Sequence, residues 1–246
     1  MRPSVRLPQL EPRVSADRRP DPNATRSQRH TTTPALMLNQ LDQIAHAFCI
    51  VLTGQTPGTP EAVYCYDMKD GAPLGHATGT FDGVSLPPEA VAAGRDRLRD
   101  VKVTHTHPND RVNVSLSDAD LRVLWLYPGI TEVDAVALDG SWFRARRVER
   151  DEDHAQASRF AYNAIRRAVL AEVQLVLCPE ASTSAEVMAF HDEVRTHLVC
   201  AALDRLGVIR YTFCMADVRA KRWKGHETRL DGWISAVVRE YKRSNW

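Results

Sequence analysis

The feature that most limits how this chain can fold is a short β-strand pattern that ends at a proline and precedes a helix start, within residues 101–121. Alternate residues of a strand point to the same face, so His105 and His107 are predicted to lie side by side at the strand's end. Pro108 ends the strand because it has no N–H to donate to a neighbouring strand. After a polar loop, Ser117 is a typical N-cap, and acidic residues follow in the first helical turn.

A strand end and the start of the next helix can bring two imidazoles and a carboxylate to one point. Two nitrogens and one oxygen form an open zinc site, which leaves the fourth position for water. Other common hydrolase motifs are absent from the sequence: it has no His-Glu-x-x-His pair, no phosphate-binding loop and no Gly-x-Ser-x-Gly turn. The alternative to a metal site is a pair of exposed strand histidines beside an acid that only caps the helix.

The same residues carry a resemblance to a known family. His105-x-His107, a gap of seven residues that begins with Pro108, and then Ser115-x-x-Asp118 resemble the metal signature of the JAMM (JAB/MPN+) zinc metalloproteases. The resemblance implies that His105, His107 and Asp118 hold zinc. It also implies that Ser115 donates a hydrogen bond to the oxyanion that forms during hydrolysis.

The family further requires a glutamate on an early strand as general acid and base. Glu61, at the head of the pattern EAVYCYDMKDG, is the best match, and Glu89 is the fallback although it lies in a predicted helix. Asp120 is interpreted as a residue of the first helical turn rather than as a ligand. The resemblance covers roughly residues 61–147, so it leaves both flanks unexplained.

The resemblance implies a compact mixed β-sheet flanked by helices, with the layering of MPN/JAB and cytidine-deaminase folds. Local patterns agree with an α/β chain in which strands and helices alternate. Asp-Gly pairs at 70–71 and 139–140 predict two hairpins. The predicted strands are 61–68, 74–80, 101–107, 131–138 and 141–147, and the predicted helices are 34–52, 87–98 and 117–127.

We predict three segments. Residues 1–33, rich in Pro, Arg, Ser, Asp and Thr, are a basic disordered tail. Residues 34–150 form the JAB/MPN-like domain, and residues 151–246 form a mainly helical extension that packs on it. The extension contains predicted helices at 155–177, 184–206 and 230–241, a strand candidate at 208–215 that could rejoin the sheet, and a basic stretch at 219–226 that is interpreted as a solvated loop.

Composition narrows the class of protein. The chain has 246 residues, of which 43% are hydrophobic, enough for one good core and an accessory segment. Its 32 basic and 31 acidic residues balance, so charge does not indicate a nucleic-acid or membrane partner. Five widely spaced cysteines without a Cys-x-x-Cys pair favour a reducing, cytoplasmic setting. No stretch has the length of a membrane span, and no secretory signal is recognised.

These observations predict a zinc-dependent metalloprotease or isopeptidase that acts on a protein or peptide, which the resemblance extends to conjugates of a ubiquitin-like modifier. Compact JAB domains of this kind resemble those of phages and other mobile elements of bacteria. Two alternatives stay open: a non-catalytic MPN-like scaffold, and a metal-dependent hydrolase of a nucleic acid or a small molecule.

Overall fold

A computed structural model describes residues 38–54, 58–108, 115–148, 159, 161–167, 185–224 and 226–245. The predicted tail at 1–33 and most of the predicted helix at 155–177 lie outside these residues. Within them, no helix is both long and apolar enough to cross a membrane.

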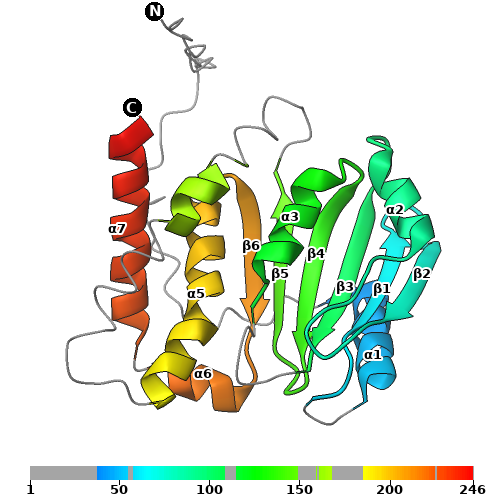
Figure 1. The fold of residues 1–246 in the computed structure, drawn as a ribbon, viewed down its shortest axis with the longest axis horizontal. Helices are drawn as coiled ribbons and strands as arrows, with labels where there is room; N and C mark the ends of the chain where they lie inside the picture. The colour runs from blue at the N-terminus through cyan, green and yellow to red at the C-terminus, as the bar shows by residue number, and fades with distance from the viewer. Residues whose placement is uncertain are drawn as a thin grey trace, which may run out of the picture.

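The centre of the molecule is a six-stranded mixed sheet with the strand order β2-β1-β3-β4-β5-β6 (Figure 1). The pair β3–β4 is parallel, and the other neighbouring strands are antiparallel. The predicted mixed sheet flanked by helices is therefore confirmed. The strands are β1 (Ala62–Asp67), β2 (Pro73–Thr78), β3 (Val101–His107), β4 (Ile130–Ala137), β5 (Trp142–Arg147) and β6 (Ile209–Cys214).

Six helices are bounded among the described residues, and they cover both faces of the sheet. Helices α2, α3 and α5 lie on the face that is nearer in Figure 1, and α7 stands beside α5. Helix α1 packs against β1 and β3 from the opposite face. The helices are α1 (Gln40–Thr53), α2 (Pro88–Arg95), α3 (Asp118–Leu126), α5 (Ala185–Arg205), α6 (Asp217–Lys224) and α7 (Glu227–Asn245).

Strand β3 shows why the site lies where it does. Every residue of this central strand is buried, and its two faces differ in chemistry. Val101 and Val103 enter the hydrophobic core below α2 and α3, and two further steps along the same face bring His105 and His107. The candidate site is therefore the polar end of a hydrophobic row, next to the start of α3.

The C-terminal part of the chain completes this core. Strand β6 pairs antiparallel with β5, and Leu198 and Leu203 of α5 are buried in the same cluster as the valines of β3. Residues 219–226, predicted to be a loop, largely fall within α6 and the turn after it. The basic residues of this stretch therefore lie mostly on a helix, and its Trp223 is buried.

Candidate metal centre

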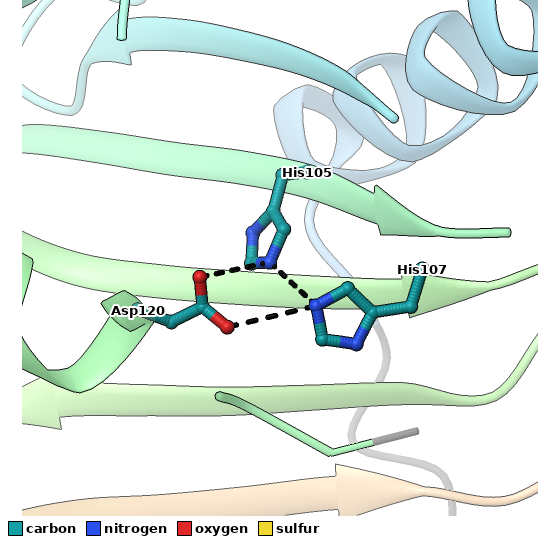
Figure 2. Close-up of side chains that lie close together, drawn as sticks. All are labelled: His105, His107 and Asp120. Atoms are coloured by element: carbon teal, nitrogen blue, oxygen red, sulfur yellow. Dashed lines mark hydrogen bonds and ion pairs between the residues drawn. The ribbon is translucent and has the colours of Figure 1, made fainter. Parts of the chain in front are cut away.

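The two predicted histidines converge. Nε2 of His105 lies 2.9 Å from Nε2 of His107, and both side chains are almost completely buried. Figure 2 shows the two rings turned toward each other and toward one carboxylate. The alternative of two exposed strand histidines is therefore wrong.

The carboxylate beside these rings belongs to Asp120. Its Oδ1 lies 3.1 Å from Nε2 of His105 and its Oδ2 lies 3.6 Å from Nε2 of His107 (Figure 2). The same side chain closes a capping box, because its Oδ2 accepts the backbone N–H of Ser117 at 2.6 Å. This second bond fixes the carboxylate against the strand end, so the acid that was interpreted as part of the helix start also belongs to the site.

Asp118, the predicted ligand, lies elsewhere. Its Oδ1 accepts a hydrogen bond from the Tyr162 hydroxyl at 2.6 Å, and its Oδ2 lies 2.5 Å from Nε of Arg166. Residues two apart on an α-helix are rotated by about 200°, so Asp118 and Asp120 cannot face the same point. The structure thus brings Asp120, and not the predicted Asp118, to the two histidines, and it places Asp118 against Tyr162 and Arg166.

Electrostatics hold the His–Asp group together. Burial would lower the pKa of His105, but the carboxylates of Asp120 and Glu61 outweigh burial and raise this pKa to about 9. The pKa of Asp120 is held well below its usual value, because its attraction to His105 and His107 exceeds the cost of burial. The two imidazoles therefore stabilise the ionised form of the Asp120 carboxylate.

The donor set fits a divalent zinc ion. Zinc ligand atoms lie about 2.0–2.2 Å from the ion, which puts two tetrahedral ligands roughly 3.3 Å apart. The two imidazole nitrogens lie 2.9 Å apart, and each lies 3.1 or 3.6 Å from one of the two Asp120 oxygens, which is close to this spacing. The His105 ring also hydrogen-bonds the Asp134 backbone, and metal-bound histidines are commonly oriented by a hydrogen bond of this kind.

Glu61 lies on the wall of the cavity that contains the three groups. The cavity has a volume of about 300 Å³, and Glu61, Ser117 and Asp120 contribute its polar surface together with the histidines. In the register of β1 with β3, Val63 lies opposite His105, so Glu61 follows on the same face at the level of His107. Burial raises the pKa of Glu61, and the nearby Asp120 adds to this rise, although both histidines oppose it.

Ser115, the predicted oxyanion donor, is not in the described lining of this cavity. It is fully buried, and its Oγ lies 2.9 Å from the Tyr211 hydroxyl. Ser117 lines the cavity instead. Its Oγ accepts the backbone N–H of Asp120 at 3.2 Å, and a hydroxyl that accepts one bond keeps its own proton for donation.

A second group of acids lies on the opposite face of the sheet, under α1. Asp42, Glu132 and Asp134 lie close enough together to hold a metal ion, but the ammonium group of Lys102 contacts all three. Arg144 also contacts each of the three acids, and its guanidinium lies 2.8 Å from both oxygens of Asp134. Because Lys102 and Arg144 already contact all three acids, we interpret this cluster as a structural ion network.

The chain was compared with protein-family models, with curated proteins and with solved structures, and none of these comparisons gives a match.

One signal in the sequence could have located the acid. The pattern Ser-x-x-Asp occurs twice in overlapping frames, as Ser115-x-x-Asp118 and as Ser117-x-x-Asp120. Only the second frame has the serine at the N-cap and the aspartate at N3, where a capping box turns the carboxylate back toward the preceding chain. The spacing of the family signature after His107 matches the first frame, and it therefore indicated Asp118 rather than Asp120.

Proposed function

We propose that this protein is a zinc-dependent hydrolase of amide bonds, of the JAMM metalloprotease type, in which His105, His107 and Asp120 hold the ion. The observation that carries the proposal is the convergence of two imidazole nitrogens and one carboxylate at one wall of a cavity that Glu61 also lines. A pair of histidines and an acid that can hold the ion, with a separate glutamate that can move a proton, provide the groups that metal-assisted hydrolysis uses.

When bound, zinc would polarise the scissile carbonyl and lower the pKa of a water molecule in the site. Glu61 accepts a proton from the attacking water, whose oxygen adds to the carbonyl carbon. The carbon–nitrogen bond then breaks, and Glu61 delivers the proton to the departing amine. Its raised pKa suits a group that must both take up and release a proton near neutral pH. The Ser117 hydroxyl donates to the carbonyl oxygen as negative charge develops there.

The substrate proposed for this site is a peptide or isopeptide bond, including the bond to a ubiquitin-like modifier. The cavity also supports a second candidate, hydrolysis of a small-molecule amide, because about 300 Å³ lies at the lower end of the range of small-molecule pockets. Hydrolysis of a model peptide, but not of the same residue as a free amide, would favour the peptidase over this second candidate.

The test combines metal analysis with two matched glutamate variants. We expect about one zinc per chain in the purified protein. Glu61→Gln should retain the zinc and lose at least about 100-fold in kcat, because proton transfer is removed while the ligands remain. Glu89→Gln is the control, since Glu89 is exposed on α2, and it should retain both zinc and activity.

Two outcomes would contradict the proposal. Purified protein that binds no zinc, even when zinc is supplied in excess, would remove the metal centre. Full zinc occupancy with no hydrolysis of peptide, isopeptide or small amide substrates would instead support the non-catalytic scaffold.

A further inference from the structure

A solvent-exposed aromatic side chain lies beside the candidate metal centre. Phe81, in the connection between β2 and α2, is 63% exposed and lines the same cavity as the two histidines. Exposed apolar side chains are common when they are scattered over a surface. An aromatic at the rim of a concave site, beside polar reactive groups, instead has the arrangement of a ligand-binding pocket.

The turn that carries Phe81 is closely fixed. A β-bridge joins Thr80 to Gly83, with the Thr80 backbone N–H donating to the Gly83 carbonyl at 2.8 Å. The Thr80 hydroxyl donates to the Asp82 carboxylate at 2.7 Å. Gly79 approaches Gly83 so closely that a Cβ atom on it would lie 2.0 Å from the Gly83 carbonyl oxygen. The sequence therefore builds a tight turn that fixes where Phe81 stands.

The same turn is hydrogen-bonded to Glu61. The Glu61 backbone N–H donates to the Thr80 carbonyl at 2.7 Å, and the Gly79 N–H donates to the Glu61 carbonyl at 2.8 Å. These two bonds fix the position of the rim relative to the backbone of the proposed general base. A group that contacts Phe81 is thus held at a defined place relative to Glu61.

The cavity wall next to Phe81 is apolar. Val84 and Leu86 continue the rim from the same connection, and Val123 of α3 contributes to the same cavity. On the sheet side, buried valines of β1, β3 and β4 line the cavity beside the two histidines. The charged side chains among the described lining residues are the acids Glu61, Asp82 and Asp120, and none of these residues is Lys or Arg. This lining favours an apolar group and disfavours an anionic one.

We propose that the part of this cavity beside Phe81 is a subsite for one apolar side chain of the substrate, of the size of leucine or phenylalanine, next to the scissile carbonyl, and that Phe81 is its specificity-determining residue. The inference rests on the proposed function for the identity of the bond that is cleaved. The preference for an apolar side chain depends only on the lining, so it can be measured by binding without any turnover.

The experiment measures binding to Glu61→Gln protein with isotope-labelled methyl groups. Two blocked peptides that differ only in one residue, leucine or glycine, are titrated separately. The leucine peptide should bind at least about 10-fold more tightly, since a single methylene in an apolar pocket is worth about 10-fold or more. It should also shift the methyl signals of Val84, Leu86 and Val123. Introducing Phe81→Ala into the Glu61→Gln protein should remove most of the difference in affinity between the two peptides.

Leu126→Ala provides the matched control. Leu126 is 58% exposed on α3 and is not among the described residues that line the cavity, so its truncation should leave the preference unchanged. Equal affinity for the two peptides, or a preference that survives Phe81→Ala, would overturn the inference.

Wild-type turnover of the same peptides separates the two proposals. Side-chain-dependent binding without hydrolysis would support the subsite and overturn the proposed peptidase. Zinc-dependent hydrolysis of both peptides with equal kcat/KM and equal affinity would support the peptidase and overturn the subsite.

Discussion

Two aspartates in the first turn of α3 have separate tasks, although only one residue lies between them. Asp120 contacts His105 and His107, and Asp118 contacts Tyr162 and Arg166. The difference arises from helix geometry, which turns neighbouring carboxylates to different sides. The assignment of the third ligand can therefore be tested by changing one acid at a time.

We expect Asp120→Asn to weaken zinc binding by at least about 10-fold, because the amide carries no charge and two neutral imidazoles hold zinc poorly by themselves. Asp118→Asn should leave zinc affinity unchanged and cost about 1 kcal/mol of stability through its contacts to Tyr162 and Arg166. Competition with a chelator measures the first effect, and denaturant unfolding of the metal-free protein measures the second. The reverse pattern would restore Asp118 as the ligand.

At the level of elements, α1 contacts the sheet through buried ion pairs as well as through apolar side chains. Asp42 of α1 meets Lys102 of β3 and Arg144 of β5, and His46 of α1 lies 3.0 Å from Asp134 of β4. Buried pairs of this kind are weak evidence for net stability, but removing one partner leaves an uncompensated charge. The backbone of the same Asp134 also hydrogen-bonds the His105 ring, which joins this network to the candidate metal centre.

The buried network predicts how stability depends on pH. Burial alone would raise the pKa of Asp134, but Lys102, His46 and Arg144 hold it below its usual value. A lowered folded-state pKa means that the ionised carboxylate stabilises the protein above the unfolded-state pKa of about 3.9, and that this contribution is lost as the pH falls further. We therefore expect stability to decline below about pH 4.

Asp134→Asn should reduce the free energy of unfolding at pH 7 by about 3 kcal/mol, because it removes one partner of a buried network. It should also flatten the acid decline. Urea unfolding of metal-free protein between pH 3 and pH 7 measures both effects, with the exposed Asp70→Asn as control. An unchanged pH dependence in Asp134→Asn would show that other acids dominate the decline.

At the scale of the whole molecule, the C-terminal segment contacts the chain just before α3, next to the candidate site. The Tyr211 hydroxyl of β6 lies 2.9 Å from Oγ of Ser115 and 3.1 Å from Nδ1 of His197 in α5. All three residues are buried, and Ser115 stands just before the Ser117 cap. The predicted extension is thus joined to the sheet and to the loop that precedes α3.

We expect Tyr211→Phe to lower stability by about 1–3 kcal/mol, since it removes a hydroxyl that two buried polar groups contact. Zinc affinity should stay within about twofold, because the Ser117–Asp120 capping box is retained. Thermal unfolding with and without zinc measures both quantities. A large loss of zinc with little loss of stability would instead place Ser115 and Tyr211 in the metal centre.

Local patterns in the sequence determined much of this protein. Period-two spacing put His105 and His107 on one face of β3, Pro108 ended that strand, and Ser117 began α3 because capping depends on neighbouring residues alone. The alternation of strands and helices indicated the mixed sheet. Even the return of the chain as β6 was marked by the apolar stretch at 208–215.

Only the tertiary structure decided which acid contacts the histidines and which serine lines the cavity, and it placed the predicted Glu61 on the wall of that cavity. The rotation of α3 against the end of β3 selected Asp120 over Asp118, and the cap geometry brought Ser117 rather than Ser115 to the cavity. Glu61 reaches the same face through the antiparallel register of β1 with β3. A motif fixes spacing along the chain, whereas coordination depends on the directions in which side chains leave packed elements, and those directions follow from the packing.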